Sequence, residues 1–555
     1  MPSEPPARRS WARTLPLLLL TTVVALVLVL LPDAFDLVRR GGSVGSLLEL
    51  LRDPAPEAAL NAISNAAEVV SAVFGIAITV VAIVVELAAN RYTHRITELF
   101  LKDRINGAVM GFFVVSGIVS LTVVLLFDPG GMRVEGGFVP HFGVTMATGM
   151  LAASMLVLLP YFAHVFEFLT PTNVLRRMRQ DALRAIARGR DVAAMHREAL
   201  RGIEQTADVG LNAIEHKDKG IAMAAVRSLA ELLEAYRGMR EQLPEAWFRM
   251  DGLLVENPDF VSMSPEALQT LSKRRIWFET KVLREYQTLY AEALGRIRDV
   301  AYLIAIHTRH LAEEALRHGD DHVFEVAVKF FNTYIRATLN ARDVRTAYNV
   351  FNQYRLLAEQ ALERGDGQPA VEIARYFKYY GLLAYQAELP FVLETVAYDL
   401  AALCERAHAR RSPAARSLLR IFLEVDREGE GEVQEKSLRG VRKAQLKLAT
   451  YYLLHDDEPL ARLVFEDMRN ERRERLASIR DELMAVQSPE FWEVSDRGVN
   501  FDYLPPERKE QLERFFSWFG ETLPPPRPTL TPMTPAVRPT PPTTPPAAGQ
   551  RTEPG

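Results

Sequence analysis

The sequence predicts an all-α protein with a transmembrane bundle of four helices, a soluble body of helical hairpins and a disordered tail. Four long apolar runs lie in the first 170 residues, and the remaining 385 contain none. From Thr172 to about Phe519, apolar residues recur every three or four positions without the alternation typical of strands. The predicted parts are an N-terminal tail (1–13), the transmembrane domain (14–170), a juxtamembrane helical region (171–298), a hairpin-repeat domain (299–519) and a proline-rich tail (520–555).

Each apolar run is long enough for a membrane-spanning helix. A helix needs ~20 apolar residues to cross ~30 Å of hydrocarbon, and the runs are Thr14–Leu31, Ala66–Ala89, Ala108–Phe127 and Phe142–Phe162. The first run follows three arginines, as the apolar part of a signal peptide does. We interpret it as a retained span, because it is longer than a usual signal segment and Leu31 is not followed by a clear cleavage site.

Basic residues in the short loops predict the orientation of these spans. The loop between the second and third runs and the segment after the fourth are rich in arginine, whereas the loop between the third and fourth carries only Arg133. Three arginines between the first and second runs are a mild exception. Because Lys and Arg accumulate on the cytoplasmic side, we expect both termini to be cytoplasmic.

One face of the second span carries a candidate polar stripe. Glu68, Gly75, Thr79 and Glu86, together with two alanines, recur at steps that place them on one side of a helix. Our preferred interpretation is a packing seam, because small residues let helices approach closely. The alternative is a pore lining, because carboxylates at membrane depth are usually functional.

His164 and Glu167 follow the fourth span where it should leave the membrane. We expect them to approach the loop Arg91–Asn106 and to form an ion-pair cluster at the membrane surface. The arginine-rich stretch Arg176–Arg188 comes next. It is interpreted either as a helix lying on anionic lipid headgroups or as a continuation of the span.

The segment Ile78–Asp103, with the sequence ITVVAIVVELAANRYTHRITELFLKD, resembles a bacterial family of predicted membrane proteins known only as a domain of unknown function. The shared features are an apolar span, a polar turn with an aromatic residue and an arginine, a short amphipathic helix and another span. The resemblance covers roughly residues 60–180. It implies a multi-pass protein of the bacterial inner membrane and no particular reaction.

An internal repeat is predicted in the soluble body. Leu311–Asp320 aligns with Leu357–Asp366 at an offset of 46 residues, and weaker copies begin at Leu403 and Leu448. Gly319 and Gly365 are predicted to close two of the helices. We expect four stacked helical hairpins that present a surface to a partner. A non-repeating helical bundle is the alternative.

No catalytic motif, cofactor-binding motif or cysteine pair is present in the sequence, and we expect neither an enzyme nor a cofactor. His307, His310, Glu314 and His318 have the spacing of metal ligands on one helix, but they follow the apolar side of that helix. We therefore prefer partly buried histidines over a metal site. The net charge of −4 gives no general affinity for nucleic acid.

The tail from Leu523 to Gly555 contains twelve prolines and few large apolar residues. This composition predicts disorder with polyproline II segments.

Taken together, the sequence favours a protein anchored in the lipid bilayer whose helical repeats bind a protein partner, with self-association through the small-residue faces. A small homo-oligomeric channel gated by the soluble domain is the alternative function.

Overall fold

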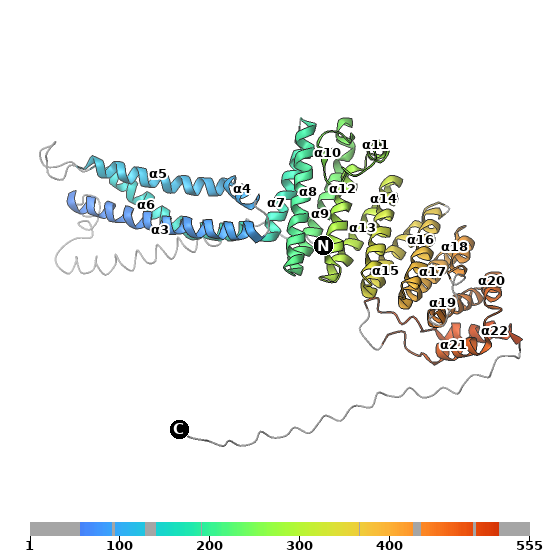
Figure 1. Cartoon of the computed structure of the whole chain (residues 1–555). Coiled ribbons are helices and arrows are strands. Elements are labelled where there is room, and N and C mark those ends of the chain that lie inside the picture. The colour runs from blue at the N-terminus through green and yellow to red at the C-terminus, as the bar shows by residue number, and fades with distance from the viewer. Residues whose placement is uncertain are drawn as a thin grey trace, which may run out of the picture. The chain divides into compact units, whose positions relative to one another are not determined.

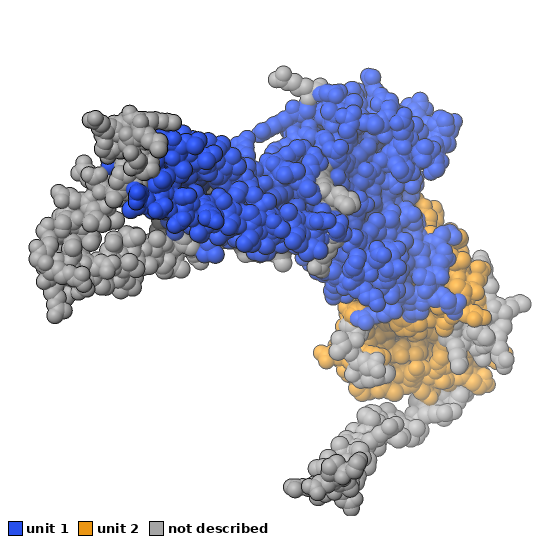
Figure 2. All heavy atoms as spheres, turned by 60° about the vertical axis from the view of Figure 1, so that its left-hand side comes forward, with its two compact units in different colours: residues 1–346 blue, residues 347–555 orange. Residues whose placement is uncertain are grey.

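The computed structural model describes residues 56–91, 95–127, 140–189, 191–365, 367–425, 434–491 and 496–520. Over these ranges the chain forms helices and no strands, which confirms the predicted all-α class. The first apolar run, Thr14–Leu31, and the proline-rich tail lie outside the described residues. The chain divides into two compact units, residues 1–346 and 347–555 (Figure 2).

Three long apolar helices form the membrane bundle of the first unit. They are α3 (Pro56–Arg91), α5 (Arg104–Leu126) and α6 (His141–Phe168), and they lie side by side (Figure 1). Each is long and apolar enough to span a membrane. The short helix α4 (Arg95–Leu101) precedes α5. Predicted runs two to four therefore all fall on helices.

The helix α3 is longer than its predicted apolar run. Its 36 residues extend about 54 Å, well beyond the ~30 Å of hydrocarbon. The helix begins at Pro56, ten residues before Ala66. The apolar run did not include these first turns, because they carry polar residues such as Asn61 and Asn65. Hydropathy locates the apolar part of a helix and does not detect a polar extension at its end.

The bundle is held together by bulky side chains of α3. The rings of Phe74 and Phe113 stack with their centroids 4.3 Å apart, and Val70, Phe113 and Leu151 form one buried cluster. A second cluster includes Val81 and Val85. These contacts place the valine- and phenylalanine-rich face of α3 against α5 and α6.

The chain turns directly after the last apolar helix. The helix α6 ends at Phe168, and Leu169 and Thr170 separate it from α7 (Pro171–Arg188), which has proline in its first turn. The α7 side chains Val174, Leu175, Met178, Ala182 and Ile186 are buried, and α7 packs on α8 (Val192–Glu215) and α9 (Lys219–Met239). The interpretation of this stretch as a continuation of the span is therefore wrong, and its apolar face lies against protein.

The rest of the first unit is a stack of helices. Aspartates cap the N-termini of several of them; the Asp218 side chain, for example, accepts a hydrogen bond from the backbone N–H of Ile221. Large aromatic side chains, including Trp247 and Trp277, fill the core. The elements after α9 are η2 (Arg240–Gln242), η3 (Glu245–Phe248), α10 (Leu253–Glu256), α11 (Pro265–Arg274), α12 (Trp277–Ala293), α13 (Arg298–His318) and α14 (Asp321–Asn340).

The second unit begins within α15 and is also helical. In it α17 packs against α16, α18 and α19, and α19 packs against α20 and α22. The helices are α15 (Val344–Ala361), α16 (Gln368–Gln386), α17 (Pro390–Ala409), α18 (Ala415–Leu423), α19 (Gln434–Leu454), α20 (Glu458–Met468), α21 (Arg473–Ala485) and α22 (Pro506–Ser517).

The four predicted repeat copies fall on alternate helices, namely the later turns of α13, α15, α17 and α19. Gly319 is the left-handed C-cap of α13 with φ 73°, as predicted. Gly365, in the turn after α15, also has a positive φ of 58°. The placement agrees with a hairpin period, and the repeat itself stays a prediction.

Candidate functional site

The polar stripe of the second span lies on the exposed side of α3. Glu68, Gly75, Thr79 and Glu86 are all exposed within the described residues, and a Cβ atom added to Gly75 would meet no atom within 4 Å. The hydroxyl of Thr79 donates to the backbone oxygen of Gly75 at 2.9 Å, within its own helix. The stripe is therefore not the surface through which α3 contacts α5 and α6.

A different polar cluster joins the apolar helices to the helices that follow them. Its centre is Asp103, the N-cap of α5, whose carboxylate accepts a hydrogen bond from the backbone N–H of Asn106 at 3.2 Å. The same carboxylate contacts Nε2 of His164 on α6 at 2.8 Å and Nη1 of Arg177 on α7 at 3.1 Å. A single side chain thus connects the α4–α5 turn, the apolar helix α6 and the helix α7 that follows it.

The sequence predicted one half of this cluster. The expected approach of His164 to the loop Arg91–Asn106 is confirmed by its contact with Asp103. The contribution of Arg177 was missed, although a basic helix directly after the last span was the available signal. Since Asp103 is 61 residues from His164 and 74 from Arg177, sequence spacing carries no information about these pairs.

Neighbouring side chains hold the cluster in place. The Asn106 side chain donates to the backbone oxygen of Phe100 at 3.2 Å and accepts from the Tyr161 hydroxyl at 2.8 Å. The guanidinium of Arg177 lies 4.0 Å from the ring centroid of Phe168, a cation–π contact. Phe168 in turn packs edge-to-face on Phe100 at 5.5 Å. Polar and aromatic contacts therefore both cross the junction.

The electrostatics of the cluster favour an ionised carboxylate. Burial alone would raise the pKa of Asp103, but hydrogen bonds from His164, Arg177 and the Asn106 amide outweigh it and hold the pKa below its usual value. An ionised Asp103 accepts from each of these donors at once. The arrangement contains no activated nucleophile. Asp103, His164 and Arg177 form a charged joint, that is, a set of polar contacts that holds three segments of the chain together.

A second charge cluster, with a fully buried carboxylate at its centre, lies among the helices of the first unit that follow α9. Glu279 on α12 is fully buried, with the guanidinium of Arg240 3.7 Å away. Arg240 also pairs with Asp320 at 2.5 Å and donates to the backbone oxygen of Arg275 at 3.0 Å. Burial raises the pKa of Glu279 to about 7, and the attraction of Arg240 only partly offsets that effect. Glu279 therefore changes its charge near neutral pH.

The histidines of α13 do not gather around a common point. His307 is half-buried and His310 and His318 are exposed, and the rings of His307 and His310 are 6.2 Å apart. Glu314 lies 3.6 Å from Arg237. Burial lowers the pKa of His307 to about 4, so that its ring is neutral at pH 7. Within the described ranges, no three His, Cys, Asp or Glu side chains are arranged to hold a metal ion.

These features define a helical membrane protein whose apolar bundle is joined to the following helices through a partly buried charge cluster. Residues 7–237 match the family described as "Predicted membrane protein (DUF2254)". The predicted resemblance to a membrane family of unknown function is thereby confirmed, over a longer stretch than residues 60–180. The match includes the Asp103 cluster and ends within α9, so the predicted repeats lie outside it.

The other two comparisons found nothing similar: no curated protein and no solved structure matches the chain.

Proposed function

We propose that this protein is a multi-pass protein of the bacterial inner membrane that holds a helical body at the cytoplasmic face to bind a protein partner. The observation that carries the proposal is the joint at Asp103, where Arg177 of α7 is fixed to two membrane helices. A flexible tether would not need such a joint. A fixed one gives the soluble body a defined orientation at the membrane.

Exposed apolar side chains on the second unit support a binding role. Tyr379 on α16 and Phe391 on α17 are 50% and 44% exposed. Aromatic residues are enriched among the side chains that dominate protein–protein interfaces. The proposal includes no reaction and no cofactor, and the bilayer and one protein are the partners it requires.

The test uses the full chain in its native membrane. A photocrosslinking residue replaces Tyr379 or Phe391, and the same residue replaces Arg469, an exposed polar position in the same unit, as the control. We expect one protein adduct of constant mass at the aromatic positions and none at Arg469. If neither aromatic position yields a reproducible protein adduct, the binding proposal is wrong.

A homo-oligomeric channel is the second candidate. The observation that favours it is the exposure of Glu68, Gly75, Thr79 and Glu86 on α3, since an outward-facing stripe is able to line a path between several copies. Channel function requires an oligomer in lipid and a conductance that changes with Glu86→Gln but not with Glu57→Gln, an exposed carboxylate in the first turn of α3. A protein that stays monomeric in both lipid and detergent contradicts this candidate.

A further inference from the structure

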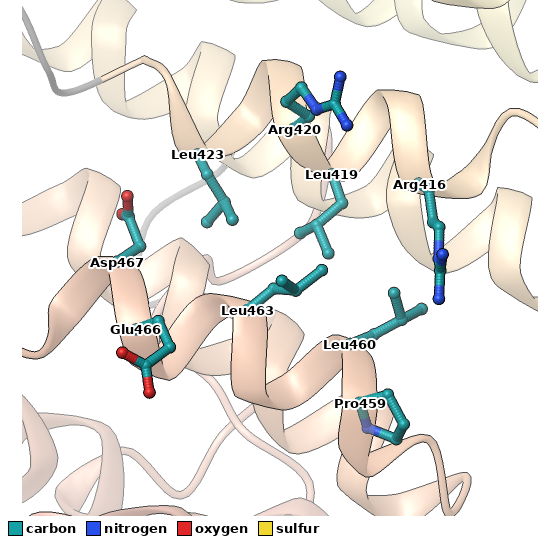
Figure 3. Close-up of a pocket in the computed structure, with 9 residues that line it drawn as sticks. All are labelled: Arg416, Leu419, Arg420, Leu423, Pro459, Leu460, Leu463, Glu466 and Asp467. Carbon is teal, nitrogen blue, oxygen red and sulfur yellow. The ribbon is translucent and has the colours of Figure 1, made fainter.

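An open groove lies between α18 and α20 in the second unit. Four leucines from the two helices point toward one another across it (Figure 3), and its volume is about 740 Å³. Three of these leucines are buried, whereas Leu463 is 48% exposed. This volume accommodates a few apolar side chains of a bound segment. The leucines are Leu419, Leu423, Leu460 and Leu463.

The two ends of the groove carry opposite charges. Glu466 and Asp467 lie at the C-terminal end of α20, and Arg416 lies beside Pro459 at the other end (Figure 3). Asp467 is paired with Arg442 at 3.0 Å, and Glu466 forms an exposed pair with Arg469 at 3.5 Å. An exposed pair of this kind contributes little to stability, so Glu466 is able to exchange Arg469 for another cation. A bound segment therefore has a preferred direction, with a cation at the Glu466 end and hydrogen-bond acceptors at the Arg416 end.

The end of α22 lies near the Glu466 end of this groove, and the C-terminal tail begins there. Arg514 pairs with Glu458 at 3.1 Å, Arg462 lies 3.7 Å from the ring centroid of Trp518, and the rings of Phe465 and Phe519 are 4.7 Å apart. These three contacts place the C-terminal end of α22 and the residues just after it beside α20. The 35 residues after Gly520 thus start one helix away from the groove.

The tail contains a segment with matching chemistry. A polyproline II helix has three residues per turn and rises ~3.1 Å per residue. Arg527, Leu530, Met533 and Ala536 are spaced by three, so that in this conformation they share one face. Leu530 and Met533 are then separated by about 9 Å, close to the ~10 Å that α20 covers from Pro459 to Glu466.

We propose that residues 527–536 of the tail occupy the α18–α20 groove as an extended polyproline-type segment. Leu530 and Met533 pack in the groove against Leu463, its one exposed leucine, and Arg527 pairs with Glu466. Arg416 donates to tail carbonyl groups, which have no internal partner in this conformation. The tether from Gly520 gives the segment a millimolar effective concentration, which favours a contact within one chain.

This contact goes beyond the proposed function because it forms within a single chain and needs no partner. The contact would also limit the access of other proteins to the groove, since a protein that binds there must first displace the tail. The two ideas are tested separately, because Tyr379 and Phe391 do not line the groove.

Disulfide trapping in the full chain tests the proposal. Cys404 is buried and is replaced by alanine, and cysteines are introduced at Leu463 and Met533. The control pair is Leu454→Cys with Met533→Cys, because Leu454 is 39% exposed but outside the groove. We expect an intramolecular disulfide that forms at least about fivefold faster with Leu463 than with Leu454. Equal rates, or disulfides that link two copies, overturn the proposal.

Hydrogen exchange provides a second measurement that requires no cysteine. Ending the chain after Gly520 should increase exchange in α18 and α20, and a peptide of residues 521–545 should reverse the increase. The double variant Leu530→Asp, Met533→Asp should behave like the shortened chain. Val537→Asp, which lies off the shared face, should behave like the natural chain. Unchanged exchange in the shortened chain contradicts tail binding.

Discussion

At the scale of single residues, Asp103 joins segments that lie far apart in the chain. Its carboxylate caps α5 and also contacts His164 and Arg177, so three helices depend on one charge. The carboxylate accepts the hydrogen bonds that water would otherwise accept from His164 and Arg177. Removing it leaves those groups without their acceptor, which costs more than the net value of the contacts themselves.

We predict that Asp103→Ala weakens the junction between the membrane bundle and α7. The expected loss is about 1–3 kcal/mol of unfolding free energy, because buried donors lose their acceptor. Hydrogen exchange in lipid nanodiscs should increase in the α4–α5 turn and the first turn of α7. Glu98→Ala is the control, since the Glu98–Lys102 pair is exposed and contributes little. Equal exchange in the two variants would show that Asp103 does not hold the joint.

Glu279 makes stability depend on pH. Its pKa is raised from 4.5 to about 7, so the folded state binds the proton more tightly than the unfolded state does. The resulting contribution is fully present below pH 4.5 and is lost as pH rises through about 7. The ionised side chain is therefore a cost above neutral pH.

We predict that Glu279→Gln stabilises the protein at pH 8 and has a much smaller effect at pH 5. At ~1.4 kcal/mol per pKa unit, the gain at pH 8 is at most about 3 kcal/mol. Thermal unfolding at the two pH values measures it, with the exposed Glu241→Gln as the control. A gain that is equal at both pH values would mean that ionisation of Glu279 is not its cause.

At the scale of secondary-structure elements, close helix packing depends on particular glycines. A Cβ atom at Gly202 of α8 would lie 2.6 Å from Cβ of Ala182 on α7, whereas one at Gly238 of α9 would meet nothing within 4 Å. The methyl group of Ala182 cannot rotate out of the way, because Cβ is attached directly to the backbone. The two helices themselves would have to separate.

We predict opposite effects for two identical substitutions. Gly202→Ala should destabilise the protein by about 1–3 kcal/mol through overpacking. Gly238→Ala should stabilise it by up to about 1 kcal/mol, because alanine is the better helix former. Thermal unfolding of the two variants beside the natural protein provides the comparison. Stabilisation by both substitutions would show that α7 and α8 adjust to the added methyl group.

The sequence predicted the helices better than their faces and junctions. Apolar length alone located α3, α5 and α6, since a membrane span requires a long apolar run. It did not indicate which face of α3 packs against its neighbours, because bulky and small faces are both compatible with lipid. The turn at Leu169–Thr170 was also missed, although Pro171 was a signal for a new helix start.

At the scale of the whole molecule, the chain combines a family module with a larger helical body. The family match ends at residue 237, yet α9 continues to pack against α12 and α13 beyond it. The module and the following helices therefore share a core. We expect the helices of the first unit that follow α9 to unfold together with α7–α9 rather than as a separate domain.

The orientation of the molecule is the last prediction. Basic residues in the tail before the first run, between the second and third runs and after the fourth predict that both ends lie in the cytoplasm. A protease added to intact spheroplasts should leave the residues after Gly520 in place, whereas the same protease added to inside-out vesicles should remove them. An epitope at the C-terminus reports the cleavage, and a second one in the loop around Arg133 should show the opposite pattern. Loss of the C-terminal epitope in spheroplasts would place the helical body outside the cell, where no cytoplasmic partner could reach it.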